Sequence, residues 1–248
     1  MFTYPQTYDV LVIGAGHAGV EAALAAARLG CSVAVLTQNL DTMGAMSCNP
    51  AIGGLAKGHM VREIDALGGA MGLNTDATGI QFRMLNASKG PSVRAPRAQC
   101  DKKAYQFRIK HTLESTPGID LHQANVTEIL TKNDTITGVA TSLQMQINAH
   151  SVILSAGTFM RGLMHVGMKN EKGGRMGDAT STVSDCLYEL GFQVERFKTG
   201  TPCRINGRSI DFSKTEAQHG DSPPPFFSYL ADTLTRTADD VHSLNGRL

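Results

Sequence analysis

The sequence predicts an α/β fold built on a parallel β-sheet, and three consecutive segments near its start carry this prediction. Tyr8–Ile13 is a short apolar run that ends in glycine, which is typical of a buried parallel strand. Val20–Leu29 is rich in alanine, a strong helix former, and Gly30 follows it where glycine often ends a helix. Ser32–Thr37 is a second apolar run. Together these segments predict one strand–helix–strand unit.

The link between the first strand and the helix has the pattern GxGxxG. Its residues are Gly14, Ala15, Gly16, His17, Ala18 and Gly19. The pattern follows a strand directly and opens a helix, which is the setting of a dinucleotide-binding fingerprint. There Gly14 permits the tight turn, Gly16 lets the backbone approach a pyrophosphate, and Gly19 lets the helix pack closely on the strand. Because the N–H groups at the helix start bind phosphates, we expect a Rossmann-like nucleotide site rather than a glycine-rich turn without a ligand.

The end of the second strand departs from the usual pattern of such a site. A Rossmann site usually has Asp or Glu there to bind the ribose hydroxyls. This chain has Thr37-Gln38-Asn39 instead. A neutral side chain or Asp41 is the alternative for the ribose contact. No arginine stands at this point, so the sequence does not support an NADP-type phosphate site.

The middle of the chain predicts a loop, a helix, a strand and a second helix. Asp41–Gly58 is rich in Gly, Asn, Pro and Met and is expected to be a long loop. A helix ended by Gly68-Gly69 is expected next, from five residues at helical spacing: Leu55, His59, Met60, Ile64 and Leu67. Ile80–Leu85 predicts a strand, and a basic loop, Asn86–Pro96, leads into an expected helix over Arg97–Glu114.

The pattern then changes to short strands that favour FAD over NAD. Val126–Leu130, Ile136–Thr141 and Gln144–Ile147 predict a β-meander. Ser151–Leu154 predicts a return strand, which ends in the small-residue turn Ser155-Ala156-Gly157-Thr158. An NAD domain would continue with further βα units, whereas flavoproteins with two dinucleotide-binding domains return to the sheet in this way. We therefore expect a Rossmann-like FAD-binding domain of that type, with an inserted β-meander.

The charge of the chain is concentrated in one segment. The whole chain of 248 residues has a net charge of +1. Between positions 83 and 110 one acid, Asp101, stands among eight basic residues: Arg83, Lys89, Arg94, Arg97, Lys102, Lys103, Arg108 and Lys110. The segment sums to 8 − 1 = +7, so the remainder sums to 1 − 7 = −6. This segment either binds a polyanion or is a solvated helix face.

Cysteine usage and apolar segments indicate a cytoplasmic protein. The five cysteines are widely spaced without a CxxC pair, which argues against a disulfide framework and a zinc site. Neither His17 nor His59 has a second metal-ligand residue at suitable spacing, and no metal site is predicted. Met1–Asp9 has no basic region followed by an apolar one, so no signal peptide is expected. The apolar runs are too short to span a bilayer.

Several motifs resemble the MnmG (GidA) family of tRNA uridine 5-carboxymethylaminomethyl modification enzymes. The similarity extends to about Ser228. The motifs are Ser47-Cys48-Asn49-Pro50-Ala51-Ile52-Gly53-Gly54, Lys57-Gly58-His59, Asp65-Ala66-Leu67-Gly68-Gly69, Asn86-Ala87-Ser88-Lys89-Gly90-Pro91, Gly157-Thr158-Phe159, Gly173-Gly174-Arg175 and Lys198-Thr199-Gly200-Thr201-Pro202.

The resemblance implies FAD reduced by NADH, methylene-tetrahydrofolate as carbon donor, tRNA as substrate, a homodimer and an MnmE-type GTPase partner. The resemblance assigns contacts with FAD to Gly14–Gly19, Val126 and Ser181. Ser181 is expected in the first turn of a helix over Asp178–Leu190. Residues 1–200 are expected to form the FAD-binding domain, and residues 201–248 the truncated start of a second, NADH-binding region. The alternatives are a folate- and FAD-dependent tRNA uridine C5-methyltransferase and a truncated, non-catalytic flavin-binding module.

Individual side chains remain open to two interpretations. Cys48 follows the second strand in a loop, where its thiol either faces a flavin as nucleophile or acid or is a small packed residue. The candidates for contact with tRNA phosphates or folate are Lys89, Arg94 and Arg97. Pro96 lies between the two arginines and restricts the backbone that positions them.

Overall fold

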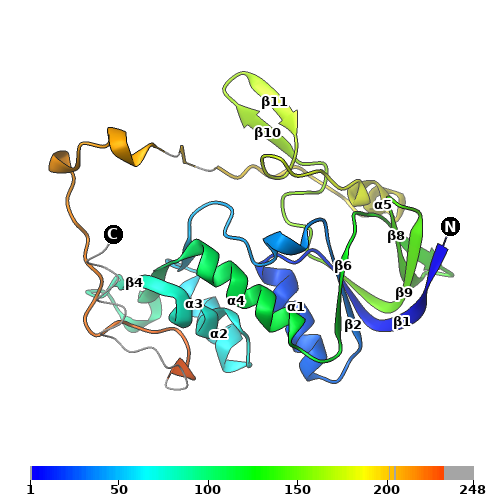
Figure 1. The fold of residues 1–248 in the computed structure, drawn as a ribbon, viewed down its shortest axis with the longest axis horizontal. Coiled ribbons are helices and arrows are strands. Elements are labelled where there is room, and N and C mark those ends of the chain that lie inside the picture. Colours follow the sequence, from blue (N-terminus) through cyan, green and yellow to red (C-terminus); the bar gives the residue numbers. More distant parts are fainter. Residues whose placement is uncertain (1, 201, 204, 232–248) are drawn as a thin grey trace. The chain divides into compact units, whose positions relative to one another are not determined.

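The computed structural model describes residues 2–200, 202–203 and 205–231, which gather into two compact units (Figure 1). The first unit comprises Met1–Ala45 and Gln106–Glu195, and the second comprises Met46–Tyr105 and Arg196–Leu248. The expected division at residue 200 stays a prediction. No helix in the described residues is both long and apolar enough to cross a membrane.

The first unit is built on a six-stranded sheet with the order β6-β2-β1-β9-β8-β7. The strands are β1 (Phe2–Ile13), β2 (Val33–Thr37), β6 (Ile119–Gln123), β7 (Val126–Lys132), β8 (Thr135–Thr141) and β9 (Met145–Leu154). Strands β6, β2, β1 and β9 are parallel, whereas β9, β8 and β7 are antiparallel neighbours. This mixed sheet confirms the predicted α/β fold of the Rossmann type with a β-meander.

Strand β9 corrects one detail of the prediction. The third meander strand and the return strand, expected separately, form one continuous strand. It pairs with β1 along most of its length, from Met145 opposite Phe2 to Leu154 opposite Ile13, and its first half also pairs with β8, with Ile147 opposite Val139. No glycine or proline interrupts this strand, so the chain runs through it without a turn.

The two faces of this sheet are covered by different helices. Helix α5 (Val183–Glu189) packs on β7, and its Val183 and Cys186 join an apolar cluster with Leu11 and Leu36. The alternate residues of β1 and β2 point to the other face, because successive strand side chains alternate. Helix α1 (His17–Arg28) packs there and buries four apolar side chains: Val20, Ala23, Leu24 and Ala26.

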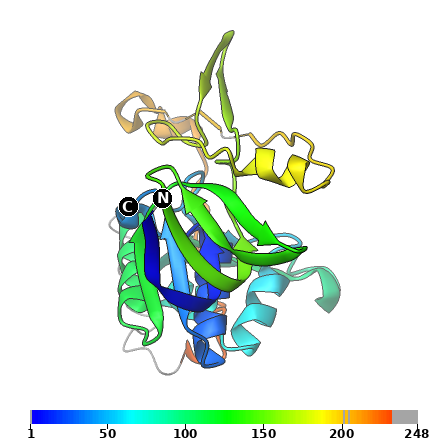
Figure 2. The same ribbon diagram turned by 90° about the vertical axis from the view of Figure 1, so that its right-hand side faces the viewer.

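A short hairpin projects from this unit (Figure 2). It consists of β10 (Leu163–Val166) and β11 (Lys169–Lys172). The expected helix over Asp178–Leu190 is shorter than predicted, because it begins only at Val183.

The second unit contains a three-stranded antiparallel sheet with the order β3-β5-β4 and two helices. The elements are β3 (Ala51–Gly53), α2 (Gly58–Ala66), α3 (Met71–Thr78), β4 (Gly79–Leu85) and β5 (Ala95–Cys100). Helix α4 (Lys102–Glu114) begins in this unit and ends in the first. Short 3₁₀ helices cover Leu40–Thr42, Pro91–Val93, Gly207–Ser209 and Phe212–Lys214.

The predicted helix over Arg97–Glu114 is therefore wrong over its first residues. Burial alternates along Ala95–Cys100, which is the period of a strand rather than a helix. The helix starts after Asp101, whose Oδ1 accepts the N–H groups of Lys103 and Ala104 at 2.9 Å each. This contact caps the helix and fixes its first turn.

Two acidic side chains of the second unit hold the 226–229 segment. The carboxylate of Asp76 is fully buried and accepts the N–H groups of Phe227 at 2.9 Å and of Ser228 at 2.7 Å. Asp65 Oδ2 accepts the N–H of Tyr229 at 2.8 Å. The ring of Phe227 is 1% exposed. These acids satisfy backbone donors that would otherwise be buried without acceptors.

Substitution of Asp76 is expected to remove a pH-dependent component of stability. Burial raises the pKa of Asp76 from its ordinary value of 3.8 to about 6, although the two backbone N–H groups act in the opposite direction. Asp76 therefore makes its full contribution to the free energy of unfolding below its unfolded pKa, and this contribution is lost as pH rises through about 6. The difference in unfolding free energy between the parent and Asp76→Asn should therefore shrink between pH 4 and pH 7, as measured by urea unfolding.

The exposed carboxyl of Asp211, in the same unit, supplies a matched control. The difference in unfolding free energy between the parent and Asp211→Asn should not shrink between pH 4 and pH 7. If Asp76→Asn and the parent kept a constant difference from pH 4 to pH 7, the assignment of this pH dependence to Asp76 would be wrong.

Candidate nucleotide-binding site

The loop after β1 has the backbone geometry that the glycine pattern predicts. Gly14 has φ +98°, in the left-handed region that favours glycine, and its N–H donates to Leu36 O of β2 at 2.8 Å. A Cβ on Gly14 would lie 2.6 Å from Ser155 O. The first glycine is therefore required both for the turn and for the contact with the end of β9.

The other two glycines of the pattern differ in what surrounds them. A Cβ on Gly19 would lie 1.8 Å from Gly14 O, so helix α1 touches the backbone of its own loop. A Cβ on Gly16 would meet no atom within 4 Å. Gly16 is the N-cap of α1, provides no side-chain cap, and no acidic residue occupies the first helical turn. Open space thus borders the positive end of a helix dipole, which fits a phosphate group.

The turn after β9 lies against this loop, as the sequence predicted. Ser155 Oγ is within hydrogen-bonding distance of two carbonyl oxygens, Ile13 O at 2.9 Å and Gly14 O at 3.1 Å. Gly157 has φ +58°, and a Cβ there would meet no atom within 4 Å. The small residues after β9 therefore brace the glycine loop while leaving space beside Gly157.

Val126 and Ser181, carried over from the family resemblance, are in direct contact. Ser181 Oγ donates to Val126 O at 2.6 Å and accepts the N–H of Val183 at 3.2 Å. Both residues are buried, at 3% and 4% exposure. Ser181 lies before α5 rather than in its first turn, which corrects the expected position. Its hydroxyl fixes the start of β7, and contact of either residue with FAD stays a prediction.

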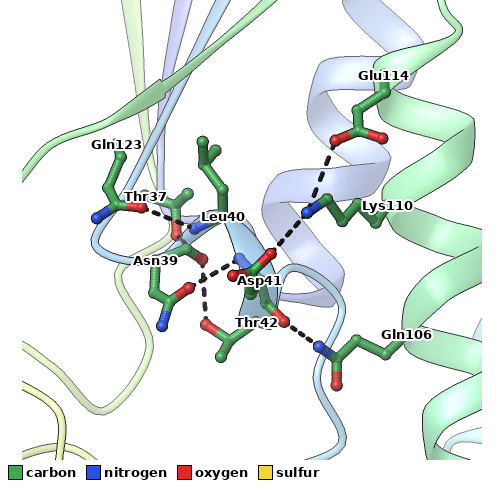
Figure 3. A network of polar contacts seen from close by, with 9 residues as sticks. All are labelled: Thr37, Asn39, Leu40, Asp41, Thr42, Gln106, Lys110, Glu114 and Gln123. Carbon is green, nitrogen blue, oxygen red and sulfur yellow. Dashed lines mark hydrogen bonds and ion pairs between the residues drawn. The ribbon is translucent and has the colours of Figure 1, made fainter.

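The end of β2 is held by a polar network (Figure 3). Asn39 Oδ1 accepts the N–H of Asp41 at 2.7 Å, and Lys110 Nζ binds Asp41 Oδ1 at 2.7 Å. Gln106 Nε2 donates to Asp41 O, and Lys110 Nζ lies 3.8 Å from Glu114 Oε1. The Lys110 ammonium lowers the pKa of Asp41. Asp41, one alternative for the ribose contact, thus already has a cationic partner.

Gln38 offers an acceptor at the position where a Rossmann site usually carries an acid. Its Nε2 donates to Asn125 Oδ1 at 3.3 Å, while its Oε1 is buried and has no hydrogen-bond partner among the described residues. Asn125 Nδ2 in turn donates to Thr180 O at 3.3 Å. A chain of contacts therefore joins the end of β2 to Val126 and Ser181. The sequence could have indicated Gln38 by its place, but its neutral amide did not distinguish it from its neighbours.

The candidate polyanion-binding residues are divided between a loop and a strand. Lys89 and Arg94 are exposed in the loop after β4, where Arg94 Nε donates to Lys89 O at 3.1 Å. Arg97 lies in β5 instead of following the loop into a helix. Lys110 of the same basic segment pairs with Asp41 and Glu114, so its charge is compensated.

The remaining candidates have simpler surroundings. Cys48 is exposed, which does not match a small packed residue. Burial lowers the pKa of His17, the first residue of α1, and therefore favours its neutral form. The five cysteines form no disulfide with one another, and the described residues contain no group of three metal-ligating side chains.

The chain matches the model of one protein family over almost its whole length. Residues 9–243 match the family described as glucose inhibited division protein A. It is 58% identical over 232 residues to the tRNA uridine 5-carboxymethylaminomethyl modification enzyme MnmG of Geobacter metallireducens, covering 93% of this chain and 37% of the relative. The MnmG enzyme of Geotalea uraniireducens is 54% identical over 243 residues, with 98% and 39% covered. The chain thus spans less than two fifths of these curated relatives.

Solved structures agree with this similarity. Aquifex aeolicus GidA superimposes with a TM-score of 0.87 at 50% identity, covering 90% of this chain and 37% of that chain. The GidA-related protein of Thermus thermophilus superimposes with a TM-score of 0.53 at 25% identity, covering 76% and 71%.

The two helix glycines are expected to respond differently to the same substitution. Gly19→Ala places a methyl group against Gly14 O and should lower the unfolding free energy by about 1–3 kcal/mol or more. Gly16→Ala places it in open space at φ −73° and should cost less than about 1 kcal/mol. Urea unfolding of the two variants checks this. Equal destabilisation would contradict the close helix–loop packing.

Proposed function

Because the chain belongs to the glucose inhibited division protein A family, we propose that it is the FAD-binding part of a tRNA wobble-uridine modification enzyme. The observation that carries the proposal is the strand–glycine–helix geometry, in which Gly16 borders open space at the start of α1. The high identity to MnmG enzymes supports the same conclusion.

In this proposal each part of the first unit has a role toward FAD. The N–H groups at the start of α1 bind the pyrophosphate, since the first turn of a helix leaves such donors without intrahelical acceptors. The buried Gln38 Oε1 accepts a ribose hydroxyl in place of the usual acid. Ser181 holds the Val126 carbonyl, and so the start of β7, in a fixed position beside the adenosine end.

The proposed reaction is that of the family. With NADH and methylene-tetrahydrofolate, the intact enzyme installs an aminomethyl or carboxymethylaminomethyl group at C5 of the tRNA wobble uridine. FAD supplies two-electron redox chemistry for this transfer. Lys89, Arg94 and Arg97 are the proposed contacts of this part with tRNA or folate, and Cys48, which is exposed, is a candidate catalytic thiol. An MnmE-type GTPase, a homodimer and a cytoplasmic location belong to the same proposal.

The first test concerns FAD binding at the glycine loop. Gly16→Val fills the space where the pyrophosphate is proposed to lie, so the purified variant should lose the flavin absorbance of the parent. The backbone conformation at Gly16 is open to any residue, and urea unfolding should therefore show a folded variant. Unchanged flavin affinity in the folded variant would refute the proposed site.

The second test concerns the ribose contact. Gln38→Met keeps the length of the side chain but removes the buried acceptor, and should weaken FAD binding about tenfold, the value of one lost hydrogen bond of about 1.4 kcal/mol. Titration of the apoprotein with FAD, followed by flavin fluorescence, measures this change. Gln193→Met changes an exposed glutamine of the first unit outside this polar network, and this matched control should bind FAD as the parent does. Equal affinities of both variants would exclude Gln38 from the ribose contact.

A further inference from the structure

We propose that Arg83 and Arg97 of the second unit form a binding site for the backbone phosphates of RNA. The inference rests on the proposed tRNA function only for the identity of the polyanion. The site itself follows from the arrangement of two arginines on the antiparallel sheet.

The two arginines lie directly opposite each other on neighbouring strands. Arg83 of β4 pairs in register with Arg97 of β5. Opposite residues of an antiparallel pair share one face of the sheet, with Cβ atoms about 4.5–5.5 Å apart. The next pair of residues, Phe82 and Ala98, is buried on the other face, so the alternation of the strands fixes the face of the arginines.

This arrangement is unfavourable without an anion. Like charges directly opposite on a sheet destabilise it. Neither arginine forms an ion pair with any residue in the described part of the chain. Asp221, an acid beside strand β4, accepts the N–H of Met84 at its Oδ2, at 2.6 Å. The positive charge of the pair is therefore not compensated by any acidic side chain that the structure describes.

Neutral amides orient the two guanidinium groups. Arg83 Nη1 donates to Gln218 Oε1 at 3.1 Å, and Arg83 Nε is buried with no acceptor among the described residues. The Gln99 amide lies against Arg97, and in the orientation that directs its oxygen to the guanidinium it accepts from both terminal nitrogens, at 3.2 and 3.0 Å. These amides hold planar donors in place without removing charge, which suits recognition of a phosphate oxygen.

The surroundings of the pair favour a polyanion over a single anion. Strand β4 ends at Leu85, about 7 Å beyond Arg83 at the rise of a strand, and the loop that follows carries the exposed cations Lys89 and Arg94. Positive charge thus continues from the sheet into the loop of the same hairpin. One phosphate or carboxylate would compensate the pair, but a chain of successive phosphodiesters also reaches the loop.

The test measures RNA binding by the whole chain as a function of salt. Arg83→Gln/Arg97→Gln should weaken binding of an anticodon stem–loop RNA about tenfold or more at 0.1 M salt. The slope of log K against log salt should flatten by between about one and two units, because each lost phosphate contact removes nearly one unit. The control Arg28→Gln/Lys132→Gln removes the same charge from two exposed positions of the first unit and should keep the parent's slope.

Flavin absorbance separates this inference from the proposed function. Loss of RNA affinity with normal flavin content supports the arginine site. An unchanged salt slope in the folded double variant overturns it, even if flavin binding is confirmed. Should the Gln variant not fold, Arg83→Lys/Arg97→Lys keeps both charges but loses the planar donors. It should bind RNA more weakly at an unchanged slope, and affinity equal to the parent's would overturn the site.

Discussion

The contact between the first turn of α1 and the loop that precedes it is the constraint on which the nucleotide site depends. A Cβ on Gly19 would come within 1.8 Å of Gly14 O, so the helix approaches the strand end more closely than any side chain permits. This approach points the start of α1 at the space beside Gly16. The third glycine sets the helix position, and the second glycine keeps the resulting space open.

The continuous strand β9 is the second element that organises the first unit. Its parallel pairing with β1 brings Ser155 against the glycine loop, and its antiparallel pairing with β8 joins it to the meander that begins at Val126. Because Gln38 binds Asn125, the residue before Val126, the end of β2 is tied to the meander. The phosphate and ribose parts of the proposed site thus share one sheet, and Gln38 lies where such a site usually carries an acid.

The acidic and the basic side chains of the second unit have different kinds of partner. Its buried acids, Asp76 and Asp65, accept hydrogen bonds from backbone N–H groups of the 226–229 segment, so their partners are donors within the fold. Among the described residues, the partly exposed arginines Arg83 and Arg97 contact neutral amides and form no ion pair. Because these carboxylates bind backbone N–H groups, they are not paired with the two arginines. The face that carries Arg83 and Arg97 therefore keeps the positive charge that an anion site needs.

The sequence by itself determined the local parts of this protein. The strand, the three glycines and the helix are neighbours in the chain, so their pattern predicted the loop, and small residues after Leu154 predicted the turn beside it. The tertiary structure alone decided which distant residues meet. Ser181 was placed in a helix, but its hydroxyl bonds Val126, 55 positions away. Arg97 was placed outside the sheet, yet it lies opposite Arg83, because a strand of six residues with a proline carries too weak a pattern to be recognised. Long-range pairing depends on register and burial, which arise only when the strands assemble.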